Sequence, residues 1–428
     1  MIIAKFGGGV LSSHKDLLRV ANIISSRQPS VVVVSALNGV TDQLVGFIED
    51  SLRGKTIEEE FIKFCKRHQA LLKNNPEELE PAFYDLRKML TGIAYTKEAS
   101  DRLRAAILSR GEYLSGLILC SYTAGYRFVP TEKLGLVAKG NYLTARCDFQ
   151  KSRISLSKTS RIITTGFYAT NEKQEICLFG RGGSDYSAGA IARLISATKV
   201  EFWKNVDGFL TADPKIVFNA KLIHEISFDE AAEICRFGAK ILHPSALEPL
   251  MGTKTLVETK NVMKPDCKGT LLYESCKKNK IAAVTGRGSI SVVSVSGNEM
   301  VESFGIAAKI MARVADAGVS VDVIATAQAN ISFSVEQKDG QNALKALNDL
   351  TAFDVRLREN LALIGVVGEG LKTEPAFLSK IFSVLSEQEI QIRMVSQGAM
   401  ESDLSLIVRK EDYETAIRAI HARLIENS

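Results

Sequence analysis

Four consecutive valines, Val31–Val34, are the stretch that most restricts the fold of this chain. A strand without a polar face has to be covered on both sides, which is typical of the centre of a parallel sheet. Ile2–Phe6 and Ile162–Thr165 read as further buried strands, and segments with helical spacing of apolar residues lie between them. This alternation predicts a doubly wound α/β domain, whose ligands bind beyond the carboxyl ends of its strands.

Residues 178 to 190 combine the end of a strand, three closely spaced glycines and the start of a helix. We expect Ser184 or Asp185 to cap a helix that runs from Tyr186 to about residue 196. Free backbone N–H groups at such a helix start attract anions. A glycine turn with a capping residue would explain everything here except Arg181, whose guanidinium suits a carboxylate or a phosphate.

Two more loops follow strands in the same way. Lys5 stands at the end of the first strand, before three glycines whose N–H groups could cradle phosphates. Ser35 and Thr41 follow the valine strand. Each feature also has a purely structural explanation, because a glycine turn needs no ligand and hydroxyl residues are common in caps and turns.

Two charged residues are ambiguous when they are considered alone. Glu112 lies within a long helical region, residues 56 to 124, where a glutamate is commonly a solvated surface charge. Lys240 lies near a predicted helix end, where a cation is favourable without any ligand.

The composition excludes several classes of protein. The net charge of +5 comes from 54 basic and 49 acidic residues spread along the 428-residue chain, so no footprint for nucleic acid is expected. No apolar run is long enough to span a bilayer, and the first residues lack a signal-peptide pattern, so we expect a cytoplasmic protein. Seven cysteines without a Cys-x-x-Cys motif argue against a disulfide framework or a zinc site, and no metal-ligating residues are predicted.

Taken together and in order, the motifs of the first 275 residues resemble those of aspartokinases, members of the amino acid kinase superfamily. The segment from Phe237 to Pro244, Phe-Gly-Ala-Lys-Ile-Leu-His-Pro, is the most specific of them. The others are Lys5-Phe6-Gly7-Gly8, Val34-Ser35-Ala36, Gly39-Val40-Thr41, Gly111-Glu112, the stretch from Gly180 to Ser187, Asp207-Gly208 and Asp213-Pro214.

The resemblance implies transfer of the γ-phosphoryl group of MgATP to the side-chain carboxylate of L-aspartate, which yields 4-phospho-L-aspartate. This is the first step of lysine (diaminopimelate), threonine and methionine biosynthesis. The acceptor carboxylate is already ionised at neutral pH, so the reaction needs positioning and charge neutralisation rather than a general base.

The resemblance also implies roles for individual residues, with Mg²⁺ entering together with ATP. Lys5, Arg181 and Asp185 would be catalytic. The substrate would be bound by Ser35, Thr41, Glu112, Arg181 and Asp185, with Arg181 on its α-carboxylate and Glu112 on its ammonium. The nucleotide would be bound by Lys5, Phe6, Gly7, Gly8, Lys204, Lys215 and Lys240.

The chain departs from the family pattern where that family holds the nucleoside. Lys204-Asn205 replaces Thr-Asp, Leu210 replaces Tyr, and Lys215 replaces Arg. Gly9-Val10 also stands in place of Thr-Ser after the N-terminal glycines. Side-chain contacts to adenine and ribose are therefore expected to differ from those of the family.

The last 150 residues repeat one pattern of an apolar strand, a helix, two strands and a helix. The predicted segments are a catalytic domain (1 to 275) and two α+β, ferredoxin-like units (281 to 350 and 351 to 428) that resemble ACT domains. That resemblance implies an amino-acid effector bound at Ser320, Val321 and Asp322, with L-lysine expected, although residue 328 is Gln where lysine-sensitive members have Glu. Exposed sheet edges predict a homodimer or a higher homo-oligomer.

Three other functions would explain parts of the sequence. A kinase acting on glutamate or acetylglutamate would share the phosphate loops but lack the segment before Pro244 and the paired repeats. A non-catalytic amino-acid sensor would need only residues 281 to 428. A nicotinamide dehydrogenase is disfavoured because Asp185 occupies the third glycine position of the dinucleotide fingerprint.

Overall fold

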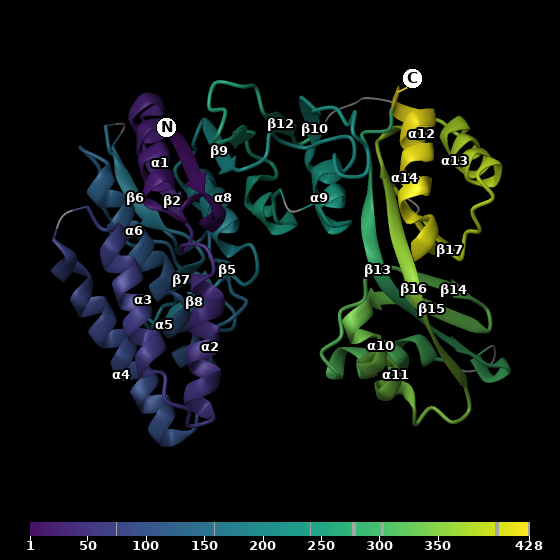
Figure 1. Ribbon diagram of the computed structural model, residues 1–428, viewed down its shortest axis with the longest axis horizontal. Coiled ribbons are helices and arrows are strands. Elements are labelled where there is room, and N and C mark those ends of the chain that lie inside the picture. Colours follow the sequence, from purple (N-terminus) through teal and green to yellow (C-terminus); the bar gives the residue numbers. More distant parts are fainter. Residues whose placement is uncertain are drawn as a thin grey trace. The chain divides into compact units, whose positions relative to one another are not determined.

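The computed structural model describes residues 1–73, 75–157, 159–239, 241–275, 280–300, 304–398 and 402–426 (Figure 1). The chain forms two compact units. The first comprises residues 1–209 and 241–274, and the second comprises residues 210–240 and 275–428. The predicted segment boundaries near residues 275 and 350 stay a prediction. Among the described residues, no helix combines the length and the apolar composition that crossing a membrane requires.

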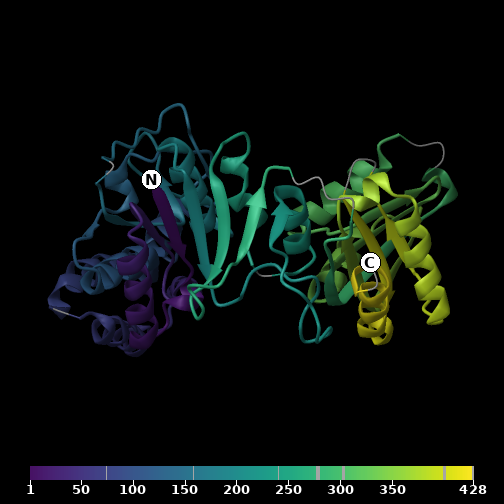
Figure 2. The same cartoon turned by 90° about the horizontal axis from the view of Figure 1, so that it is seen from above.

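A largely parallel sheet forms the centre of the first unit. Val31–Val34 is fully buried and pairs in parallel with a strand on each side, as predicted. Figure 2 shows the N-terminal strand, in purple, beside the teal strands of the same sheet. Within this unit the strand order is β12 (Thr270–Tyr273), β11 (Leu256–Asn261), β9 (Lys199–Lys204), β1 (Ile2–Phe6), β2 (Val31–Val34), β6 (Ile162–Thr165) and β3 (Arg127–Phe128), and β12 is antiparallel to β11.

Helices that pack on this sheet bury apolar faces in one large core. The first of them begins after Ser13, whose hydroxyl accepts a hydrogen bond from the N–H of Asp16 and so caps the helix. The helices of the unit are α1 (His14–Arg27), α2 (Val40–Leu52), α3 (Glu58–Leu71), α4 (Glu80–Thr96), α5 (Asp101–Leu108), α6 (Arg110–Tyr122), α7 (Thr131–Leu134) and α8 (Gly183–Leu194). Two small hairpins pair β4 (Ala138–Lys139) with β5 (Arg146–Cys147) and β7 (Tyr168–Thr170) with β8 (Ile176–Leu178).

The second unit begins with residues 210–240, which precede the repeats in the sequence and are separated from them by residues 241–274 of the first unit. This segment contains β10 (Glu225–Ser227) and α9 (Phe228–Arg236), and Ser227 and Glu230 form a capping box at the start of α9. Ala212 and Val217 of this segment pack into the hydrophobic core of the second repeat. The segment therefore folds with the C-terminal repeats.

The two repeats share one antiparallel sheet in the order β14-β15-β13-β16-β18-β17. The predicted pattern of strand, helix, two strands and helix is present in both. The first repeat has β13 (Ala283–Ser296), α10 (Ile306–Asp316), β14 (Ile324–Ala327), β15 (Asn330–Glu336) and α11 (Gly340–Leu347). The second has β16 (Asp354–Val367), the short α12 (Gly370–Thr373), α13 (Ala376–Glu387), β17 (Met394–Ser396), β18 (Asp403–Arg409) and α14 (Tyr413–His421).

The first half of each repeat's long strand packs in the core of the other repeat. β13 and β16 are long neighbouring strands, paired along their length. Val355 and Leu357 at the start of β16 pack on the core of the first repeat, whereas Val284 at the start of β13 packs in the core of the second. Each of the two cores therefore includes residues from the long strand of the other repeat.

Candidate active site

A cavity of about 650 Å³ lies in the first unit, where loops following the strands meet the N-terminal ends of α6 and α8. Its walls contain every residue predicted to be catalytic or to bind the substrate: Lys5, Ser35, Thr41, Glu112, Arg181 and Asp185. These side chains come from positions between 5 and 185 in the sequence. The fold therefore brings the separate motifs into one site.

Helix α8 begins earlier than predicted. Gly182, in the left-handed conformation with φ of 75°, precedes the first helical residue, and no side chain caps the helix. The predicted cap by Ser184 or Asp185 is wrong, because both residues lie within the first turn and are buried. A Cβ at Gly182 would lie 2.2 Å from Cβ of His243, so only glycine fits this turn.

Asp185 does not cap the helix but forms ion pairs with two lysines. One oxygen, Oδ1, lies 2.5 Å from Nζ of Lys5, and Oδ2 accepts a hydrogen bond of 2.9 Å from Nζ of Lys204. Burial alone would raise the pKa of Asp185, but the ammonium groups of Lys204 and Lys5 outweigh it and hold that pKa below its usual range. Burial lowers the pKa of Lys5 to about 8, and the charge of Lys204 also lowers it, against the opposing effect of Asp185.

Glu112 is buried rather than solvated, contrary to the simplest interpretation of its sequence context. It lies in the first turn of α6, and the Ser184 hydroxyl donates a long hydrogen bond of 3.4 Å to its Oε1. Its Oε2 is buried and has no hydrogen-bond partner within the described part of the chain. Burial raises the pKa of Glu112 to about 8. An ammonium group of a ligand would favour the ionised form of this carboxyl group, and the free oxygen is positioned to accept a hydrogen bond from it.

Arg181 differs from the buried groups around it. Its side chain is exposed at the cavity wall, and across the described ranges it has no ion-pair partner. It is therefore free to bind an anionic ligand. Ser35 and Thr41 add hydroxyl groups to the same cavity, and the left-handed Gly39, with φ of 77°, starts the helix that carries Thr41.

The residues predicted to bind the nucleotide fall into different places. The Phe6 ring is buried and stacks on Trp203 with centroids 6.0 Å apart, so only its backbone could face a ligand. Gly8 lines the cavity, whereas Lys204 is not one of its lining residues and is connected to them through its hydrogen bond with Asp185. Lys215 is exposed in the second unit, where its N–H donates to Asp213. Lys240 lies outside the described residues.

Some wall residues were not predicted from sequence. Thr144 and Phe167 contribute to the cavity, as does Asn38. Asn38 lies between the motifs Val34-Ser35-Ala36 and Gly39-Val40-Thr41, so its place in the cavity could have been predicted from the sequence. Thr144 and Phe167 lie in irregular segments without a distinctive sequence pattern. Within the described ranges, no group of three or more His, Cys, Asp or Glu side chains is arranged to hold a metal ion.

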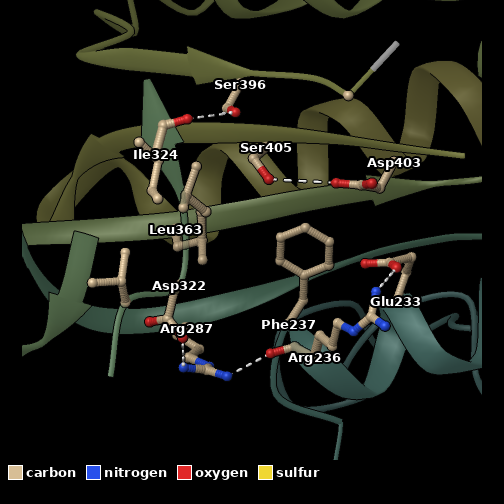
Figure 3. A pocket seen from close by; sticks show the side chains of 13 residues that line it. Glu233, Arg236, Phe237, Arg287, Asp322, Ile324, Leu363, Ser396, Asp403 and Ser405 are labelled. Carbon is tan, nitrogen blue, oxygen red and sulfur yellow. Dashed lines mark hydrogen bonds and ion pairs between the residues drawn. The ribbon is translucent and has the colours of Figure 1, made fainter. Parts of the chain in front are cut away.

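A second cavity, of about 430 Å³, lies in the second unit and includes part of the predicted effector loop (Figure 3). Val321 and Asp322 line it, while Ser320 is exposed and is not among the lining residues. Nη1 of Arg287 lies 2.9 Å from Oδ1 of Asp322, and Nη2 of Arg287 donates to the carbonyl of Arg236 at the end of α9. Burial raises the pKa of Asp322, against the lowering effect of Arg287.

The end of α9 is closely packed on the repeats. The Phe237 ring points toward the sheet in Figure 3, and a Cβ at Gly365 would lie 2.4 Å from this ring. Gly238, with φ of 122°, lies against the backbone of Gly286. Glycines in the sheet thus allow the helix end to approach β13 and β16.

Comparison with known proteins agrees with this architecture. Residues 1–258 match the amino acid kinase family, and residues 293–350 and 364–424 match the ACT domain. The chain belongs to the amino acid kinase family. The predicted fold class, a kinase-type α/β domain followed by ACT repeats, is confirmed.

Within that family, the whole chain resembles aspartokinases, as predicted. It is 30% identical to a bifunctional aspartokinase/homoserine dehydrogenase of Buchnera aphidicola, an alignment that covers 100% of this chain but 57% of that protein. It is 28% identical to the lysine-sensitive aspartokinase 3 of Escherichia coli, with 100% and 99% covered. The structure of E. coli aspartokinase III with aspartate and ADP has a TM-score of 0.82 at 27% identity, with 99% of both chains covered. The chain thus spans little more than half of the bifunctional relative.

Proposed function

We propose that this protein is an aspartate kinase, which phosphorylates the side-chain carboxylate of L-aspartate with MgATP. The observation that carries the proposal is the cavity in which Glu112, with a free buried oxygen, and Arg181, an exposed guanidinium, accompany the paired Lys5 and Asp185. A free amino acid has the two charges that these residues complement.

The proposed roles follow from charge. Glu112 takes the ammonium of aspartate and Arg181 takes its α-carboxylate, so that the side-chain carboxylate is directed at the phosphates. An oxygen of that carboxylate forms a bond to the γ-phosphorus while the bond to the β,γ-bridging oxygen breaks, and ADP leaves with that electron pair. No proton has to move. Lys5 and the glycine turn neutralise the phosphates, and Mg²⁺ enters as part of the MgATP substrate.

The position of Glu112 also disfavours acetylglutamate as the acceptor. An N-acetylated substrate has no ammonium, and its binding would leave the buried carboxylate of Glu112 without a partner. Acyl phosphate formation, trapped as the hydroxamate, tests the proposal with L-aspartate, L-glutamate and N-acetyl-L-glutamate as acceptors. We expect product from aspartate. Turnover of glutamate or acetylglutamate in its place would refute the assignment.

We further propose that the repeats bind an amino-acid effector, expected to be L-lysine, at Asp322. The lysine-sensitive relative and the cavity beside Asp322 support this proposal. An ammonium group bound at Asp322 would compete with Arg287, which also holds the C-terminal carbonyl of α9. Release of Arg287 would therefore free the carbonyl at the C-terminal end of α9. Assays with lysine, threonine and methionine, singly and in pairs, test the effector, and no inhibition at millimolar concentration would leave the repeats without this role.

We also propose self-association through the repeats. β14 and β17 are the outer strands of the shared sheet, and Ile324 and Val395 on them are 44% and 41% exposed. Exposed apolar residues on sheet edges favour pairing with another copy. Light scattering should report a dimer or a higher oligomer, and Ile324→Lys should shift it toward monomer. A monomeric wild-type protein at micromolar concentration would refute the proposal.

A further inference from the structure

Lys204 occupies a position that the proposed roles do not yet explain. It is the last residue of β9, which lies beside β1 in parallel register, with Phe6 opposite Trp203. Lys204 therefore stands level with the first glycine after β1. Both strands end at this edge of the sheet, where ligands of α/β domains bind.

The ion pairs at this edge leave an excess of positive charge. Asp185 supplies one negative charge, and Lys5 alone would balance it. Glu112, the other carboxyl group that acts on Lys5, has a pKa raised to about 8 by burial and is paired with the substrate ammonium in the proposed roles. Lys204 adds a second ammonium, and its side chain is only 17% exposed. Keeping a partly buried cation beyond what the local carboxylate can neutralise is unfavourable unless an anion completes the site.

The two ammonium groups also converge on one empty position. A Cβ placed on Gly7 would lie 3.5 Å from Nζ of Lys5 and 4.0 Å from Nζ of Lys204. Because Gly7 has no side chain, both groups face the turn without obstruction. The oxygens of a phosphoryl group are anionic acceptors of the kind that two such donors would hold.

A contact with the adenine or ribose, the role expected from the position of Lys204 in the sequence, fits this geometry poorly. The Lys204 ammonium is held by the same carboxylate that holds Lys5, the residue at the phosphate turn. A second carboxylate oxygen would not be needed to fix a lysine that merely reached the nucleoside.

We propose that Lys204 is a second phosphoryl-binding residue, held beside Lys5 by Asp185 so that two ammonium groups grip the transferred phosphoryl group of ATP. This inference rests on the proposed kinase function and deepens it. Asp185 then acts as a positioning residue for two lysines. The γ-phosphate of ATP would then contact Lys204, and ADP, which lacks this phosphate, could not form that contact.

Calorimetric titration of the full chain with MgATP, MgADP and adenosine tests the inference without relying on any acceptor. We expect Lys204→Met to weaken ATP binding by about 10-fold or more, while ADP binding changes by less than about 3-fold and adenosine binding is unchanged. Lys204→Arg should recover part of the loss because it keeps the charge. Lys151→Met is the matched control, since Lys151 pairs with Glu172 outside the cavity.

Kinetics and pH give a second readout. Removing Lys204 should lower kcat by about 100-fold and should move the alkaline limb of kcat/KM for ATP to higher pH, because the charge of Lys204 lowers the pKa of Lys5. Equal losses for ATP and ADP, or no loss for either, would overturn the role of Lys204. Wild-type binding of ATP without turnover of aspartate would instead refute the proposed function and leave the ATP-to-ADP comparison valid.

Discussion

The hydroxyl of Ser184 lies 3.4 Å from Oε1 of Glu112, across the space between the first turns of α8 and α6. This long hydrogen bond does little to compensate the burial of the carboxyl group. Oε2 is left without a partner in the described part of the chain. Backbone hydrogen bonds at Ala36 and Glu112 also lower the pKa of this carboxyl group, but burial outweighs them. Oε2 can therefore accept a further hydrogen bond from a ligand.

Replacing Glu112 should weaken aspartate binding and increase the stability of the folded protein. We expect Glu112→Gln to raise the KM for aspartate by about 100-fold and to leave the KM for ATP almost unchanged, because the ammonium loses a charged partner worth about 1.5–3 kcal/mol. The folded-state pKa of Glu112 is about 8, above its unfolded value of about 4.3, so wild-type stability falls as pH rises between these values. The Gln side chain does not ionise, so the variant does not lose stability in this way. The thermal midpoint of the variant should therefore exceed that of the wild type by more at pH 9 than at pH 5. A stability loss at both pH values would contradict the interpretation.

The pKa of Lys5 predicts the alkaline limit of activity. Since this pKa is lowered to about 8, the ammonium is lost as pH rises through that value, and a neutral amine cannot stabilise phosphate oxygens. We expect kcat/KM for ATP, which reports the free enzyme, to fall above about pH 8. The profile of kcat should fall at a higher pH, because bound phosphate favours the charged lysine. Rate measurements from pH 6 to pH 10 would detect both limbs, and coincident limbs would argue against Lys5 as the titrating group.

Arg181 should contribute to substrate binding and little to folding. Its side chain is exposed at the cavity wall, so Arg181→Ala should leave the free energy of unfolding within about 0.5 kcal/mol of that of the wild type. The KM for aspartate should rise by about 100-fold, since a charged hydrogen bond is lost. Arg181→Lys should restore little of it, because lysine lacks the bidentate fork. A greater effect on the KM for ATP would reassign Arg181 to the nucleotide.

The adjacent residues Gly8 and Gly9 provide a matched pair for the N-terminal turn. A Cβ at Gly8 would lie 2.5 Å from the carbonyl oxygen of Ala36, whereas a Cβ at Gly9 would meet no atom within 4 Å. We expect Gly8→Ala to destabilise the protein by about 1–3 kcal/mol and to weaken ATP binding, because the loops after β1 and β2 must separate. Gly9→Ala should stay within about 0.5 kcal/mol. Urea unfolding and nucleotide titration of both variants compare these effects, and equal behaviour would show that the close approach is unimportant.

Arg287 should couple effector binding to activity. In Arg287→Ala, Asp322 is free and lysine should bind at least as tightly as in wild type, but inhibition should be reduced because the link to the carbonyl of Arg236 is already absent. Calorimetry and activity assays with L-lysine separate binding from inhibition. Arg356→Ala, which breaks an exposed ion pair with Asp354, serves as the control. Full inhibition of the Arg287 variant would exclude this coupling.

The sequence alone determined the architecture and the composition of the candidate site. An all-valine strand could only be central, and the loops after β1 and β2 placed Lys5 and Ser35 at strand ends that the parallel sheet brings together. Arg181 instead follows β8, which pairs with β7 in a separate antiparallel hairpin. The repeating pattern likewise predicted the two C-terminal units. These inferences succeeded because strand burial and helical spacing are local properties, written in consecutive residues.

The tertiary structure decided what those residues contact. No spacing predicts that Asp185 pairs with both Lys5 and Lys204, that Glu112 is buried beside Ser184, or that β13 and β16 exchange halves between the repeats. Ion pairs, pKa values and shared cores depend on atoms that are far apart in the sequence and become neighbours only after folding. The sequence therefore determined which groups could perform the chemistry, and the fold determined which charges remain for a ligand to complete.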